Sequence, residues 1–159
     1  MIKRLLIANR SEIAVRIIRA CRELGIESVA VYSEPDAHAM HVAAADRAVP
    51  IGQAGSADGY LSGRTIIDAA RSAGADAVHP GYGFLSQNAA FAEACDREGL
   101  VFVGPSARAI TDMGSKIEAR RIMQHAGVPI VPGDTPADQT DDGVGAAIDR
   151  IGLPALVKA

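Results

Sequence analysis

Short apolar runs alternate with helix-like stretches along the first hundred residues. The clearest runs lie at 5–8 (LLIA), 28–32 (SVAVY) and 100–103 (LVFV). A largely apolar run of this length is typical of a strand that is covered on both faces, as in parallel sheets. The stretch 13–24 between the first two runs carries apolar residues at helical spacing and ends at Gly25. The chain is therefore predicted to form an α/β fold with an open, largely parallel, doubly wound sheet.

Weaker patterns continue this alternation. We expect helices over 38–45, 63–72 and 89–97, strands over 48–51 and 76–78, and a small-residue loop at 52–59. Asn9 or Ser11 is positioned to cap the first helix through a side-chain oxygen. His38 and His41 lie three residues apart without a third ligand nearby, so we interpret them as solvated histidines instead of a metal site. Gly114 predicts a break between two short helices.

The last part of the chain changes character at a Pro/Gly-rich passage, 126–133. Beyond it, a helix is predicted over 144–151 and the beginning of a strand over 153–159. We therefore expect one domain over 1–127 and the incomplete beginning of another over 128–159.

The stretch 79–88 (HPGYGFLSQN) joins a predicted strand to a predicted helix. Its proline restricts the backbone, whereas its two glycines permit conformations that other residues avoid. Two of the chain's six aromatic residues, Tyr82 and Phe84, stand on this bend. The alternatives are a tight connector with Phe84 buried and a surface shaped for a ligand. In either case His79 is expected to hold the turn by a hydrogen bond.

Composition and charge exclude several classes of function. A net charge of −3 and the absence of Trp give no support to nucleic-acid binding, which needs a basic patch and stacking aromatic rings. The first apolar run is too short for a signal peptide or a membrane-spanning helix, so no membrane partner is expected. Cys21 and Cys95 lie far apart, with no disulfide or metal pattern. A reducing cytoplasm fits these features best.

Nucleotide-binding motifs are incomplete. The turn 9–12 (NRSE) replaces the G-x-G-x-x-G of dinucleotide-binding proteins, which argues against a nicotinamide cofactor. No Walker A motif surrounds Lys116, whose local pattern favours a solvated helix lysine. Lys158 ends an apolar run, where a cation needs an anionic partner, so it is the better candidate for binding a ligand.

Several segments together form a set that resembles the biotin carboxylase family. In chain order they are 7–10 (IANR), 12–14 (EIA), 79–86 (HPGYGFLS), 103–105 (VGP), 113–116 (MGSK), 126–129 (AGVP) and 157–159 (VKA). Their order and spacing agree with the family along the whole chain. The resemblance implies a Rossmann-like domain that precedes an ATP-grasp fold, followed by the first part of that ATP-grasp domain.

In that family, ATP and bicarbonate are used to carboxylate a nitrogen of biotin on a carrier domain. A carboxyltransferase partner then passes the carboxyl group to an acyl-CoA or a keto acid. The resemblance implies that Lys116 and Lys158 bind ATP and that the turn with Tyr82 and Gly83 forms a wall near biotin. The family's Mg²⁺ ligands and catalytic residues would follow Ala159. This chain is therefore expected to hold no catalytic or metal-binding residue and to be inactive alone.

Similar proteins form homodimers through this domain. The resemblance implies that the first helix, with Arg19 and Glu23, is the dimer face. Two positions depart from the family pattern, since Gln87 stands where Glu is usual and Ser11 where Gly is usual. Gln87 cannot supply a carboxylate, and Ser11 weakens the case for a close backbone approach at its turn.

The leading hypothesis is the N-terminal portion of an ATP-dependent biotin carboxylase, a ligase, within an acyl-CoA carboxylase. The alternative is a non-catalytic assembly or nucleotide-sensing module of the same fold. The acyl acceptor stays open among acetyl-CoA, propionyl-CoA, other acyl-CoA and pyruvate, because the carboxyltransferase selects it.

Replacing Lys158 by Ala in the full protein tests the implied contact with ATP. A charge-assisted hydrogen bond to a phosphate contributes about 1.5–3 kcal/mol, so the affinity for ATP should fall about tenfold or more. Calorimetric titration with ATP measures the change, and an unchanged affinity would argue against the contact.

Overall fold

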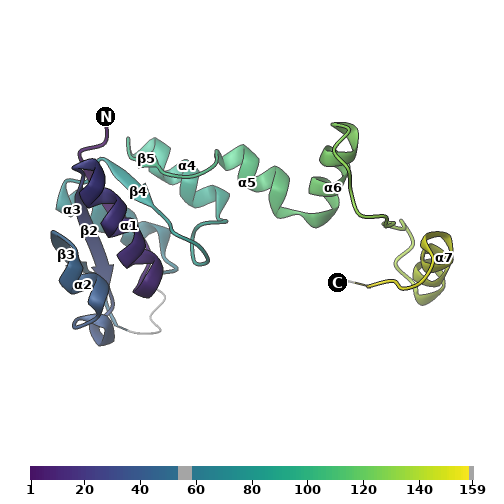
Figure 1. Cartoon of the computed structure of the whole chain (residues 1–159), viewed down its shortest axis with the longest axis horizontal. Helices are drawn as coiled ribbons and strands as arrows, with labels where there is room; N and C mark the ends of the chain where they lie inside the picture. Colours follow the sequence, from purple (N-terminus) through teal and green to yellow (C-terminus); the bar gives the residue numbers. More distant parts are fainter. Residues whose placement is uncertain (54–58, 158–159) are drawn as a thin grey trace. The chain divides into compact units, whose positions relative to one another are not determined.

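Five short strands form one sheet in the first part of the chain (Figure 1). The computed structural model describes residues 1–53 and 59–157, and the chain divides into two compact units, Met1–Thr111 and Asp112–Ala159. The strands are β1 (Arg4–Ile7), β2 (Glu27–Tyr32), β3 (Arg47–Pro50), β4 (Ala77–His79) and β5 (Val101–Phe102). All neighbouring strands are parallel, in the order β3-β2-β1-β4-β5. The predicted open parallel sheet is confirmed.

Helices connect the strands. They are α1 (Ser11–Leu24), α2 (Met40–Ala44), α3 (Gly63–Ala73) and α4 (Ala89–Arg97), with a short 3-10 turn, η1 (Glu34–Asp36), after β2. α2 packs beside α1, where Arg22 donates a hydrogen bond to the carbonyl oxygen of Ala44 at 3.2 Å. Gly25 ends α1 in the left-handed conformation, as its place in the sequence predicts. The predicted loop at 52–59 lies largely outside the described residues.

β1 is the central strand, and its side chains point alternately to the two faces of the sheet. Leu6 and Ala8 pack with α3 and α4 in one apolar cluster, whereas Leu5 and Ile7 pack with α1 in the other. Leu6 and Ile7 are fully buried. Burying one such side chain contributes about 1.5–3 kcal/mol. The continuous apolar run at 5–8 therefore reflects burial on both faces, which confirms the doubly wound arrangement.

The second unit is helical in its described part. α5 (Ala107–Gly114) crosses the division between the units, and α6 (Lys116–His125) and α7 (Asp141–Ile151) follow it. The helix breaks at Gly114 as predicted, and Ser115 caps α6 through its side chain. Arg120 ties α6 to the Pro/Gly-rich passage by donating to the carbonyl oxygens of Val131 and Gly133 at 2.6 and 2.9 Å. Within the ranges that the structure describes, no helix is long and apolar enough to cross a membrane.

The strand predicted over 153–159 is absent from its described part, 153–157. Leu153, Leu156 and Val157 are exposed instead of buried. A strand needs a neighbour to accept and donate its backbone hydrogen bonds, and the described residues of the second unit include no strand that could do so. Lys158 lies outside the described residues, and the described residues before it form no buried strand.

His41 is buried, contrary to the prediction that it is solvated like the exposed His38. Its Nε2 lies 3.2 Å from the carbonyl oxygen of Val31, so Nε2 carries the proton and donates it. Burial lowers the pKa of His41. Its Nδ1 has no hydrogen-bond partner among the described residues. The spacing of the two histidines could not indicate this burial, because it comes from the packing of α2 against β2.

The buried His41 should make stability depend on pH. The pKa of an unfolded histidine is about 6.5. Because burial lowers the folded pKa, the unfolded chain binds the proton more readily, and the free energy of unfolding should fall as pH falls below about 6.5. Urea denaturation at pH 7.5 and 5.5 measures this fall. His41→Gln should reduce it, leaving a part due to His79, whose pKa burial also lowers. The control variant His38→Gln should show the same fall in stability as the parent protein. If the His41 variant also shows the full fall of the parent, the buried His41 is not its source.

Candidate functional site

The strand order of the sheet reverses between β1 and β4. β1 leads outward to β2 and β3, after which the chain returns to β4 on the other side of β1. The carboxyl ends of β1 and β4 are level, with Ile7 paired to His79. Open parallel sheets bind ligands in the crevice at such a point. The segments that follow the two strands, 8–12 and 80–84, are therefore the candidate site.

Asn9 joins these two segments and is only 3% exposed. Its Nδ2 donates to the carbonyl oxygens of Pro80 and Tyr82, both at 2.8 Å, and its Oδ1 accepts from the backbone N–H of Arg10 at 2.9 Å. The prediction that Asn9 or Ser11 caps the first helix was wrong. Arg10 is the N-cap residue, and no side-chain hydrogen bond caps α1, because the amide of Asn9 is committed to the turn after β4.

The turn after β4 is held by the last residue of that strand. The backbone N–H of Gly81 donates to Nδ1 of His79 at 3.0 Å, which confirms the predicted role of this histidine. Because Nδ1 accepts, it carries no proton, and burial lowers the pKa of His79. Gly81 and Gly83 have φ angles of 65° and 64°. Glycine adopts positive φ without strain, so the two glycines allow the chain to turn away from the sheet.

Tyr82 projects from this turn and is 61% exposed. Its hydroxyl donates to a carboxylate oxygen of Glu12 at 3.2 Å, and this hydrogen bond raises the pKa of Tyr82. Gly83 is also exposed, and an added Cβ there would meet nothing within 4 Å. Both residues therefore lie on an accessible surface beside the first turn of α1. Their role near biotin stays a prediction.

Phe84 is 41% exposed, so the interpretation of this turn as a connector with Phe84 buried was wrong. Leu85 takes the buried position, at 3% exposure. Phe84 instead stacks on Tyr60, with ring centroids 5.3 Å apart and planes 8° apart. The hydroxyl of Tyr60 donates to Oδ2 of Asp36 at 2.9 Å, and Arg10 pairs with the same oxygen at 3.4 Å. This cluster connects four loops at the carboxyl edge of the sheet.

Sequence reasoning missed Tyr60 and Asp36. Burial raises the pKa of Tyr60 to about 12, so its hydroxyl stays protonated and donates to Asp36. Ser33 adds a hydrogen bond to the same carboxylate at 3.1 Å. The two residues lie in separate connections with no motif around them. Only the parallel pairing of β2 with its neighbours brings these loops together, so no local pattern could have identified the cluster.

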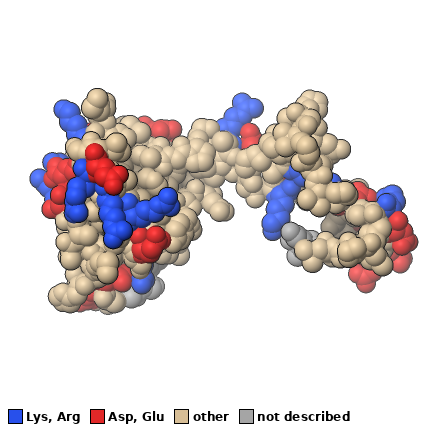
Figure 2. Space-filling view, viewed as in Figure 1, with Lys and Arg blue, Asp and Glu red and all other residues tan. Residues whose placement is uncertain are grey.

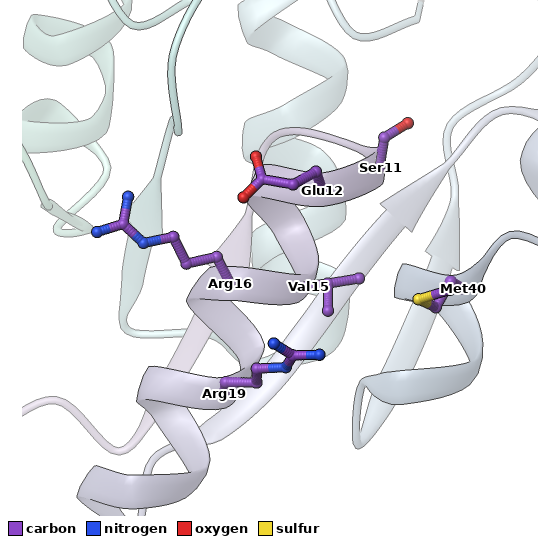
Figure 3. A pocket seen from close by; sticks show the side chains of 6 residues that line it. All are labelled: Ser11, Glu12, Val15, Arg16, Arg19 and Met40. Atoms are coloured by element: carbon purple, nitrogen blue, oxygen red, sulfur yellow. The ribbon is translucent and has the colours of Figure 1, made fainter.

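A shallow groove of about 600 Å³ runs along α1. Figure 3 shows its six lining side chains, of which five come from α1 and one, Met40, from α2. Charged side chains of both signs gather over α1 (Figure 2). They include Glu12 and Arg16 near the start of the helix and Arg19 and Glu23, the residues expected at a dimer face, farther along it. All four are exposed, so this helix face is open to a partner.

The two lysines predicted to bind ATP belong to the second unit, and their contacts with ATP stay a prediction. Lys116 is exposed at the first position of α6, in the second unit, and Lys158 lies outside the described residues. Within residues 1–53 and 59–157, no group of three or more His, Cys, Asp or Glu residues is placed to hold a metal ion.

Residues 1–110 match the family model described as the N-terminal domain of biotin carboxylase. The chain belongs to this family. Biotin carboxylase 1 from Bacillus subtilis is 56% identical over 159 residues, which cover all of this chain and 35% of the relative. The mitochondrial methylcrotonoyl-CoA carboxylase subunit alpha from Glycine max is 52% identical over 157 residues, or 99% of this chain and 22% of that protein. This chain thus spans about a third or less of the length of these relatives.

Solved structures of biotin carboxylase domains are similar to this chain in fold. The biotin carboxylase domain of a thermophilic 2-oxoglutarate carboxylase, bound to bicarbonate, has a TM-score of 0.88 at 45% identity over 100% of this chain and 36% of that one. The corresponding domain dimer from Hydrogenobacter thermophilus, in complex with MgADP, ADP and bicarbonate, has a TM-score of 0.87 at 44% identity, covering 97% and 34%. The predicted family and fold are confirmed.

Ser11 adopts a left-handed backbone conformation, with φ of 55°. Only glycine and, less often, Asn or Asp adopt this region readily. The conformation therefore favours glycine at this position, and Ser11 is strained there and does not cap the helix.

Replacing Ser11 by Gly should raise the free energy of unfolding. Glycine relieves the strain of the left-handed conformation, which costs a residue with a Cβ about 1–2 kcal/mol. Glycine also loses more conformational entropy on folding, which costs about 0.5–1 kcal/mol, so the net gain in stability should be about 0.5–1 kcal/mol. Chemical denaturation measures it. Ser72→Gly, within α3, is the matched control and should lower the free energy of unfolding. A loss of stability in the Ser11 variant would contradict the strained backbone.

Proposed function

We propose that this chain is the N-terminal part of an ATP-dependent biotin carboxylase within an acyl-CoA carboxylase. The reaction consumes ATP and bicarbonate and forms carboxybiotin, ADP and phosphate, with biotin attached to a carrier domain. The main support is the identity of 56% with Biotin carboxylase 1 over all 159 residues of this chain. The names of the relatives include a biotin carboxylase and acyl-CoA carboxylase subunits, all of which exceed this chain in length.

We propose roles for four residues of this chain. Lys116 and Lys158 would bind the phosphates of ATP, and Tyr82 and Gly83 would form a wall near biotin. Two observations support the role near biotin: Tyr82 is exposed, and its turn lies at the switch point of the sheet. Mg²⁺ ligands and catalytic groups would come from the remainder of the enzyme. The bicarbonate and MgADP named for related carboxylase domains are consistent with these roles.

We also propose that two copies associate through α1, with Arg19 and Glu23 at the contact. A related carboxylase domain is described as a dimer, and both residues are exposed on α1 here. The carrier domain and a carboxyltransferase would be the further partners. We place the protein in the cytoplasm, and we keep the boundary between the N-terminal and ATP-grasp domains at residues 127 and 128.

The full protein should release ADP from ATP only when both bicarbonate and biotin are present. A coupled ADP assay with free biotin measures this dependence, and Tyr82→Ala should raise the KM for biotin more than the KM for ATP. Ser72→Gly, far from the carboxyl edge, is the control and should change neither KM. ATP hydrolysis that does not depend on biotin would contradict the proposed reaction, and no ATP hydrolysis in a folded full protein would favour the non-catalytic alternative.

A further inference from the structure

The side-chain amide of Asn9 is nearly saturated with hydrogen bonds. Its nitrogen donates to two carbonyl oxygens, and its oxygen accepts from a backbone N–H. These partners determine which end of the amide is the nitrogen and which is the oxygen. The carbonyls of Pro80 and Tyr82 are two residues apart in the turn, and one nitrogen serves both. At 3% exposure, little water can replace these bonds. Losing the donor would leave two carbonyl oxygens unsatisfied.

The turn also fits closely against Asn9. A Cβ added to Gly81 would lie 2.7 Å from Nδ2 of Asn9. The backbone of the turn therefore approaches the amide as closely as a residue without a side chain allows. A shift of Asn9 would move the turn with it.

Tyr82 is tied to the segment after β1 at both of its ends. Asn9 binds its carbonyl oxygen at 2.8 Å, and Glu12 accepts from its hydroxyl at 3.2 Å. The phenol contact is exposed, where hydrogen bonds contribute least, whereas the contact to Asn9 is partly buried. Asn9 thus has the larger part in placing Tyr82.

We propose that Asn9 is a positioning residue for biotin, which acts by holding the turn that carries Tyr82 at the end of β4. This inference rests on the proposed biotin carboxylase function and adds a residue that does not itself touch the substrate. A wall displaced by about 1 Å binds and orients its substrate poorly. Loss of the amide should therefore weaken the use of biotin and leave the binding of ATP unaffected.

The test uses the full protein and Asn9→Asp, which keeps the shape of the side chain but removes the donor. We expect the KM for free biotin to rise about tenfold, with the KM for ATP within about twofold of the parent value. Hydrogen exchange, followed by mass spectrometry, should quicken in peptides covering 80–86 and stay unchanged in those covering 28–32. If the aspartate variant does not fold, Asn9→Ser, whose hydroxyl is too short to reach both carbonyls, should give the same pattern.

Two controls separate positioning from a loss of stability. Asn88→Asp makes the same chemical change at the start of α4, where the side-chain oxygen accepts from Phe91 and an aspartate can do the same. Ser28→Ala removes a hydrogen bond of 2.6 Å to Asp46 at the amino end of β2. Both variants should keep the KM for biotin.

The outcomes are distinguishable. A higher KM for biotin with a looser turn, in the Asn9 variants alone, supports the proposal. An unchanged KM, an unchanged exchange pattern, an equal rise in both KM values, or the same effect in Ser28→Ala overturns it. If the parent protein shows no biotin-dependent reaction, the proposed function fails and this inference fails with it, whereas variants that differ from an active parent test Asn9 itself.

Discussion

The burial of β1 on both faces is the constraint on which the rest of the first unit depends. β1 pairs with β2 on one side and β4 on the other, and its side chains enter both apolar clusters. Leu6 and Ile7 are fully buried, so neither can be exchanged for a polar residue without leaving a charge, a dipole or a cavity in a core. The helices take their places on either face because they cover this strand.

The two edges of the sheet follow from that arrangement and differ in chemistry. At the amino edge, the carboxylate of Asp76 accepts hydrogen bonds from the backbone N–H groups of Lys3 and Arg4, which holds the first strand in register. At the carboxyl edge, the loops need partners of their own. Asn9 and Asp36 supply these, and they leave Tyr82 and Phe84 at the surface. One edge is thus closed by structural contacts, whereas the other leaves two aromatic side chains exposed.

Periodicity predicted most of the fold but not how the loops fit together. The apolar run at 5–8 and the glycine at 25 indicated β1 and the end of α1 correctly. The predicted helix cap was wrong because the amide of Asn9 binds Pro80, 71 residues further along the chain, and no local pattern can indicate such a contact. The burial of His41 was also missed, because α2 is only five residues long and the spacing of its residues does not indicate which face is buried. The strand after residue 152 was predicted from apolar character alone. The described residues of the second unit contain no strand with which it could pair.

The sequence by itself determined the order of strands and helices along the chain, the parallel sheet and the turn at 79–88, because each segment carries its spacing and backbone freedom locally. The family followed from the resemblance of a whole set of motifs along the chain. Tertiary structure alone decided that Asn9 reaches the turn, that Ser11 adopts a positive φ, and that Tyr60 and Asp36 support Phe84. The physical reason is that the carboxyl ends of parallel strands bring together loops that are distant in the chain. Hydrogen bonds between those loops form only after the core has set the strands side by side.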